Sequence, residues 1–174
     1  MIATNLKFNN PQHSDEILNK SISEILTANT LLSMANIRKN GDHFESWICT
    51  AFYAFSSSLN LYILTPPDTQ HIQNLSHNKS VAVAIYDSHQ EPTQHKRGLQ
   101  VFGSCEQANG IRLVDGYRLY AMRFVWLPDF IKKPEDFAKG IIQSKLYVIH
   151  PKEIKIFDEP TFGEEVWVTV SIEN

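Results

Sequence analysis

The sequence predicts a mainly β fold, an antiparallel barrel with a few helices, and three observations lead to this prediction. About six or seven strand-like segments follow one another in mostly meander order. The helical segments between them are too few and too short for the repeated βαβ crossovers of a parallel sheet. The chain has 174 residues, 43% hydrophobic and 20% charged, which is an ordinary globular composition. We therefore expect residues 1–174 to form a single domain.

A helix is predicted at about 14–27, ahead of the strands. Ser14 suits an N-cap because acidic residues, Asp15 and Glu16, follow it in the first turn. The apolar residues that then line one helical face are Ile17, Leu18, Ile22, Ile25 and Leu26. The first strand is expected to begin at Thr30, directly after this helix.

A β-hairpin is the strongest local signal. An apolar run at 30–37 is followed by Asn40-Gly41 and a second run at 44–55. Because positions 47–55 are apolar on both faces of the second strand, we expect both faces to be buried. A small barrel has only one interior, so the other face needs a cover. A homodimer partner is one such cover, and a helix of the same chain is the alternative.

The remaining elements follow from periodicity and turn signals. Thr65 and Asp68 imitate a capping box, which predicts a short helix through Ile72 and Leu75. The barrel is expected to span about 30–107. The other expected elements are strands at 59–64, 80–86, 97–107, 145–149, 154–157 and 166–172, and helices at 111–124 and around 135–138.

Charge and hydropathy exclude several classes of function. The net charge is -3, and Lys and Arg are scattered along the chain, so the basic stripe of a nucleic-acid-binding protein is missing. No apolar run approaches the roughly 20 residues that a membrane span needs, and residues 1–10 lack a signal-peptide core. These observations favour a cytoplasmic protein with no membrane or nucleic-acid partner.

The chemistry-bearing residues form no catalytic or metal motif. Cys49 and Cys105 make no CxxC pair, and each lies in an apolar run, which favours structural thiols. His71 and His77 are off a common helix face, so no metal site is expected. The serines at 56–58 lack a G-x-S-x-G elbow. No catalytic residue can be named on these grounds.

Over residues 30–107 the order of elements resembles the pyridoxamine 5'-phosphate oxidase-like, FMN-binding split-barrel superfamily. The similar motifs are LYILT at 61–65, AVAIY at 82–86 and GLQVFG at 98–103. The later segments 120–124, 154–158 and 162–163 look more like the small branch typified by YhbP. The resemblance implies a six-stranded antiparallel split barrel of the FMN-binding type, a homodimer, and a flavoprotein of the oxidoreductase kind with an unknown substrate.

The resemblance also implies where FMN would bind. In flavin-binding relatives a Ser or Thr and the basic residues after it hold the phosphate, and those positions here are Thr69, Gln70 and His71. A glutamine matching Gln100 contacts the isoalloxazine ring, and Gln100 alternates with Leu99 and Val101 so that it can face a pocket. The other family pocket positions correspond to Cys49, Thr50, Ala51, Leu64 and Thr65.

The departures from the family pattern bear on cofactor affinity. Gln70 and His71 replace two basic residues, and each lost charge-assisted bond is worth roughly 1.5–3 kcal/mol, so FMN binding is weakened about 10²- to 10⁴-fold. FMN is therefore expected to be weakly bound or absent as purified. The cations that can compensate are Lys79, Lys96, Arg97 and Arg123.

Two further expectations concern the reaction and its alternative. The basic C-terminal segment of vitamin B6 oxidases is missing at 164–174, so pyridoxamine 5'-phosphate oxidation is not expected. The alternative to a flavoprotein is a non-catalytic split barrel that binds haem, another ligand or a protein partner. His71 and His150 are the candidate haem ligands for that alternative.

Overall fold

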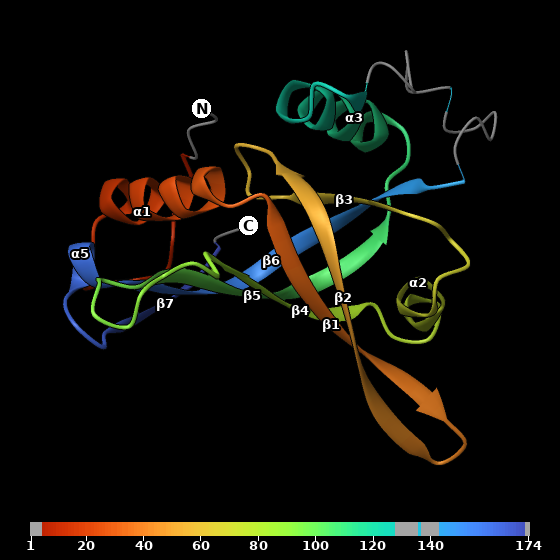
Figure 1. The fold of residues 1–174 in the computed structure, drawn as a ribbon, viewed down its shortest axis with the longest axis horizontal. Coiled ribbons are helices and arrows are strands. Elements are labelled where there is room, and N and C mark those ends of the chain that lie inside the picture. Colours follow the sequence, from red (N-terminus) through yellow and green to blue (C-terminus); the bar gives the residue numbers. More distant parts are fainter. Residues whose placement is uncertain (1–4, 128–135, 137–142, 173–174) are drawn as a thin grey trace.

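The computed structural model describes residues 5–127, 136 and 143–172, and within them one antiparallel sheet closes into a barrel (Figure 1). The strand order is β3-β2-β1-β4-β5-β6-β7, and β3 also pairs with β6, which joins six strands into a ring and leaves β7 as an extension. The predicted mainly β barrel is confirmed. The strands are β1 Leu31–Asn40, β2 His43–Phe55, β3 Leu61–Thr65, β4 Ser80–Tyr86, β5 Arg97–Gln107, β6 Lys145–Asp158 and β7 Trp167–Ser171.

The strand β6 closes the ring, and the prediction that it forms two separate strands is wrong. It runs without a break through Pro151 and pairs with β3, β5 and β7. The register against β5 shifts between Phe102 and Gly103, opposite Pro151, and such a bulge tolerates a residue without an N–H. A side chain at Gly103 would overlap the His150 carbonyl, so only glycine fits there. The ring therefore extends past the expected 30–107.

Four described helices surround the ring: α1 Asp15–Ala28, α2 Gln70–Leu75, α3 Ile111–Arg123 and α5 Glu159–Phe162. The predicted α1 is confirmed with its cap, because Ser14 Oγ accepts a hydrogen bond from the Ile17 N–H at 3.4 Å. Helices α1 and α2 lie toward opposite ends of the molecule (Figure 1) and both contribute to the barrel core. Helix α3 packs on β2 and β6. The predicted helix at 135–138 lies outside the described residues except for Asp136.

The strand β2 has one buried face and one exposed face, so the expectation of burial on both sides is wrong for the single chain. Tyr53 and Phe55 point into the core and are at most 3% exposed. On the outer face Ile48 is 67% exposed and Phe52 is 49% exposed. Helix α3 covers the end of this face at Ala54 and leaves the rest open. A helix of the same chain is therefore only a partial cover.

The predicted Asn40-Gly41 turn is confirmed, with Gly41 at φ +58°, a conformation that glycine adopts without strain. The β1–β2 hairpin extends past the rest of the barrel as an arm (Figure 1). Near its tip Phe44 is 71% exposed. Among the described helices, none is long and apolar enough to span a bilayer.

Candidate cofactor site

A polar cluster forms where β3 ends and α2 begins. His71 Nε2 lies 2.9 Å from the Thr65 hydroxyl and 3.2 Å from the Thr69 hydroxyl. The Thr69 hydroxyl donates its proton to the Pro66 carbonyl at 2.8 Å, so it accepts from His71, which assigns the imidazole proton to Nε2. Burial lowers the pKa of His71, so the ring is neutral at neutral pH. The cluster consists of hydroxyls and a neutral imidazole.

The predicted capping box at Thr65 and Asp68 is wrong. Helix α2 begins only at Gln70, and its N-cap Thr69 makes no side-chain capping bond. Proline at 66 disfavours a helical conformation at Thr65, which remains the last residue of β3. The Thr65 hydroxyl is therefore directed to His71 rather than to the helix backbone.

Two buried asparagines behind the cluster were missed by sequence reasoning. Asn36 Nδ2 donates to the His71 carbonyl at 2.6 Å, and Asn74 Nδ2 donates to Asn36 Oδ1 at 3.0 Å. Gln70 Nε2 donates in turn to Asn74 Oδ1 at 2.8 Å. Asn36 stands at an inward position of an otherwise apolar strand face, which is the signal that could have revealed it. The network fixes α2 on β1 and engages the Gln70 amide.

The four compensating cations bond elsewhere. Lys79 pairs with Glu106 at 3.0 Å, Lys96 with Glu159 at 4.0 Å, and Arg97 with Asp158 at 2.9 Å. Arg123 donates to backbone carbonyls at the end of α1. In the part of the chain that is described, no Lys or Arg hydrogen-bonds to Thr65, Thr69 or His71. The cluster itself offers two hydroxyls and a neutral imidazole, and none of the four cations bonds to it, although Lys145 lies opposite Thr65 in the β3–β6 register; the cluster is therefore a poor match for the phosphate dianion of FMN.

A row of small and polar side chains crosses the outer face of four neighbouring strands. In the sheet register Thr50 pairs with Ser33, Ser33 with Ala84, and Ala84 with Gln100. Three strand spacings of about 4.8 Å make this outer row roughly 14 Å long. Gln100 faces outward while Leu99 and Val101 are 2% exposed, so the predicted alternation is confirmed.

Exposed apolar side chains border the outer row on both sides. Ile48 and Phe102 lie on one side, Phe52 and Tyr86 on the other, and they are 37–67% exposed. Neither the Thr50 hydroxyl nor the Gln100 amide makes a side-chain hydrogen bond to another described residue. The face therefore offers apolar side chains around a row of unused polar groups, and a pocket of about 460 Å³ opens on it beside Ser33, Thr50 and Ala84.

A cation at the end of the outer row was also missed. Lys155 of β6 pairs with Gln100, and its ammonium lies 5.2 Å from the centre of the Trp167 ring. Trp167 stacks on Phe157 with ring centroids 4.6 Å apart. The signal was present in the sequence, because Lys155 alternates with Ile154 and Ile156, both at most 1% exposed.

The remaining predicted site residues lie apart from the outer row. The side chains of Cys49 and Ala51 face the barrel core, and burial raises the pKa of Cys49 to about 11. Leu64 packs with the second apolar cluster, beside α3. The structure thus brings Thr65, Thr69 and His71 together and aligns Thr50 with Gln100.

The near-closed ring of six antiparallel strands with few helices matches the split-barrel fold of pyridoxamine 5'-phosphate oxidase-like proteins. No model of a known protein family and no curated protein matches the chain.

Among solved structures, a haem-binding protein from Mycobacterium smegmatis is similar, with a TM-score of 0.65 and 13% identity over 87% of this chain and 57% of that protein. A Clostridium acetobutylicum protein of the pyridoxinephosphate oxidase family, related to general stress protein 26, gives a TM-score of 0.58 and 11% identity over 89% and 93%. The haem storage protein HutZ from Vibrio cholerae gives a TM-score of 0.54 and 15% identity over 76% of this chain and 88% of that protein. The chain spans little more than half of the first of these proteins, and the similarity is one of fold.

Proposed function

We propose that the chain is a flavin-binding split-barrel protein that binds the isoalloxazine ring on the outer row. The observation that carries the proposal is the alignment of Thr50, Gln100 and Lys155 across an exposed apolar face. The unused Gln100 amide can hydrogen-bond the pyrimidine edge of the ring. The Lys155 ammonium supplies positive charge beside that edge, which is a common way for a protein to tune a flavin.

The proposal includes a homodimer that covers this face. The outer face exposes Ile48, Phe52, Tyr86 and Phe102, and soluble monomers rarely leave a contiguous patch of this kind uncovered. Light scattering after size exclusion should give twice the chain mass. Ile48→Glu should yield monomers, whereas Ile17→Glu, at an exposed isoleucine on α1, should leave the dimer intact. A monomeric wild-type protein would contradict this part of the proposal.

The cluster where the FMN phosphate would lie predicts that FMN and riboflavin bind with similar affinity. Because the cluster of Thr65, Thr69 and His71 offers no charge, the phosphate of FMN gains little there. We expect FMN and riboflavin to bind within about tenfold of each other, a difference of about 1.4 kcal/mol or less. Titration followed by flavin fluorescence measures both constants. A preference for FMN of a thousandfold would show that a phosphate site exists elsewhere.

A matched pair of variants tests the ring site. Gln100→Leu removes the amide from the outer row, and Gln107→Leu removes an exposed amide from the end of the same strand. Loss of one or two hydrogen bonds should weaken flavin binding about tenfold in the first variant only. Equal effects, or no flavin binding by the folded wild type at high micromolar flavin, would remove the proposal.

Bound flavin would itself accept and donate electrons, and the chain's own residues would hold and orient it. By this proposal the protein is a cytoplasmic oxidoreductase of the branch typified by YhbP, with a substrate other than pyridoxamine 5'-phosphate. The absorbance of added flavin should bleach under a chemical reductant and return in air. The rate of that return in the presence of candidate substrates measures turnover.

A second candidate is a haem-binding split barrel, favoured because two similar structures are those of a haem-binding and a haem storage protein. His71 is the better ligand, through the Nδ1 that its protonated Nε2 leaves free, since His150 Nε2 is buried and close to Glu106. A Soret band on haem titration that His71→Gln abolishes and His150→Gln preserves would support this candidate. An unchanged spectrum would exclude it.

A further inference from the structure

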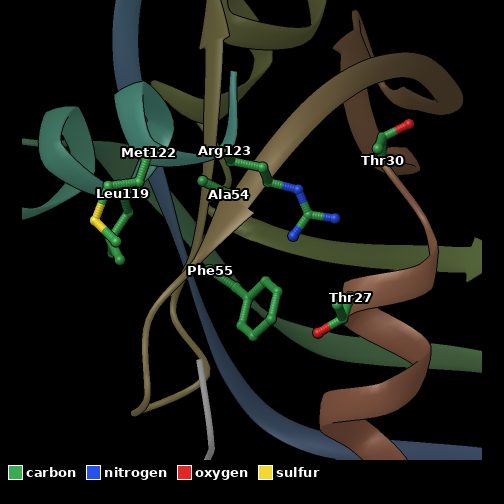
Figure 2. A pocket seen from close by; sticks show the side chains of 7 residues that line it. All are labelled: Thr27, Thr30, Ala54, Phe55, Leu119, Met122 and Arg123. Carbon is green, nitrogen blue, oxygen red and sulfur yellow. The ribbon is translucent and has the colours of Figure 1, made fainter. Parts of the chain in front are cut away.

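A cavity of about 350 Å³ lies where α1, β2 and α3 end, and it shares no residue with the outer row (Figure 2). Its volume is near the lower end of the roughly 300–1,000 Å³ that small-molecule sites occupy. The residues that line it are Thr27, Thr30, Ala54, Phe55, Leu119, Met122 and Arg123. The cavity therefore has room for a ligand smaller than a flavin.

Arg123 is the polar anchor of this cavity. Its Nη2 donates to the Leu26 carbonyl at 2.8 Å and to the Asn29 carbonyl, at the C-terminal end of α1. The guanidinium also lies 4.8 Å from the centre of the Tyr53 ring and 5.3 Å from that of Phe55. The two carbonyl contacts use two of its five N–H donors. The group is held in place and still has donors to offer.

The charge of Arg123 has no counterion within the described part of the chain. No Asp or Glu there pairs with it, although it is half-buried between α1 and α3. Burial lowers its pKa, but a guanidinium stays protonated at neutral pH. A partly desolvated cation without an anion is unfavourable, so an anion that enters the cavity gains from this charge.

The rest of the cavity is mostly apolar. Phe55 and Leu119 form buried walls, and Met122, which is 66% exposed, lies at the side open to solvent. Figure 2 shows the Thr27 hydroxyl directed toward the space below the guanidinium. A single positive charge beside hydrocarbon walls matches one negative charge on an apolar body and disfavours a phosphate dianion.

We infer that this cavity binds a small monocarboxylate with an apolar body. The carboxylate pairs with the Arg123 guanidinium and accepts from the Thr27 hydroxyl, and the hydrocarbon part contacts Phe55, Leu119 and Met122. Because the two carbonyls use both Nη2 donors, the carboxylate accepts from Nε or Nη1, the donors that remain. The site is independent of flavin binding.

Calorimetric titration of the purified full chain with phenylacetate and octanoate tests the inference. The uncharged phenethyl alcohol and inorganic phosphate are the comparison probes. We expect millimolar or tighter binding of a carboxylate and at least tenfold weaker binding of both comparison probes. Arg123→Gln should weaken carboxylate binding about 10- to 100-fold. Arg118→Gln, at an exposed arginine on the same helix, should leave it unchanged.

A second variant keeps the test decisive if Arg123→Gln does not fold. Thr27→Phe, at an exposed position, should fill the cavity while Arg123 keeps its bonds to the α1 carbonyls. Binding should then be lost with folding intact. Equal binding by the wild type and Thr27→Phe, preference for phosphate, or no carboxylate binding at millimolar concentration would overturn the inference.

Discussion

Arg97 and Arg123 are both half-buried arginines at the ends of secondary-structure elements, yet their surroundings differ. Arg97 is bidentate to Asp158, with Nε 2.9 Å from Oδ1 and Nη2 3.0 Å from Oδ2, and Nη2 also bonds Glu24 at 2.8 Å. Asp158 is fully buried and accepts from Ser21 and Thr161 as well. Arg123 bonds to backbone carbonyls and lies over aromatic faces, and no carboxylate of a described residue pairs with it.

The difference separates a structural arginine from one with capacity for a ligand. Around Arg97 two carboxylates and two hydroxyls complete the hydrogen bonding and join α1, β5 and β6. Around Arg123 no carboxylate of a described residue pairs with the positive charge, which borders a cavity. Removal of each side chain should therefore have a different dominant consequence, loss of stability for Arg97 and loss of binding for Arg123.

Arg97→Met should have the largest effect on stability. It leaves the buried Asp158 carboxylate without its counterion, which should lower the free energy of unfolding by about 3 kcal/mol, since Arg97 itself is partly exposed. Urea denaturation followed by circular dichroism measures the change. Arg38→Met breaks an exposed pair with Glu45 and should lower it by less than about 1 kcal/mol. Equal losses of unfolding free energy in Arg97→Met and Arg38→Met would contradict a structural role for Arg97.

Gly116→Ala should displace the helix that carries Arg123 without touching Arg97. A Cβ at Gly116 would overlap Leu146 and the Tyr62 ring, so α3 must shift away from the barrel. Overpacking should exceed the helix-propensity gain and lower the free energy of unfolding by about 2 kcal/mol. Carboxylate binding should weaken too. A stabilised variant would show that α3 packs less closely than described.

Arg123→Gln should lower stability by only about 1–2 kcal/mol. The variant loses the bonds to the Leu26 and Asn29 carbonyls and the favourable charge at the C-terminal end of α1, but it leaves no carboxylate unpaired. The same urea titration gives the value. A loss as large as that of Arg97→Met would indicate that Arg123 balances a buried anion.

The smallest effect on stability should come from His71, which titrates in a pH range where both arginines stay charged. Its pKa is lowered in the folded state, so below the unfolded value of about 6.5 the unfolded chain binds more protons. Stability from this group is complete above about pH 6.5 and falls as the pH decreases toward the folded pKa. Urea midpoints in this range should depend on pH less in His71→Gln than in the wild type. An unchanged slope would assign the pH dependence to other groups.

Local signals predicted the fold well and failed where a tertiary contact decided the outcome. The α1 cap, the Asn40-Gly41 hairpin and the bounds of β5 depend on neighbouring residues, and all were predictable. The predicted gap between 149 and 154 is wrong because the bulge at Lys152, which lets β6 continue through Pro151, forms only against β5, far away in sequence.

The candidate sites were predictable only in part for the same reason. Gln100 was found through its alternation and a family resemblance, whereas Lys155 becomes its neighbour only through strand register. The Arg123 cavity joins residues from α1, β2 and α3, and no spacing within any one segment indicates it. Sequence patterns predict which side chains share one face of a helix or strand. Which faces of distant elements lie together can be seen only in the folded structure.

The threefold pairing of β6 has a consequence for how the chain folds. The ring closes only when β6 pairs with β3, so the free edge of β3 stays unpaired while residues 66–144 are synthesised, and that of β5 stays unpaired while residues 108–144 are synthesised. Until β6 leaves the ribosome, these edges can pair with other chains. A chain truncated before Lys145 should therefore aggregate on release, even though β1, β2, β4 and β5 are all present in it.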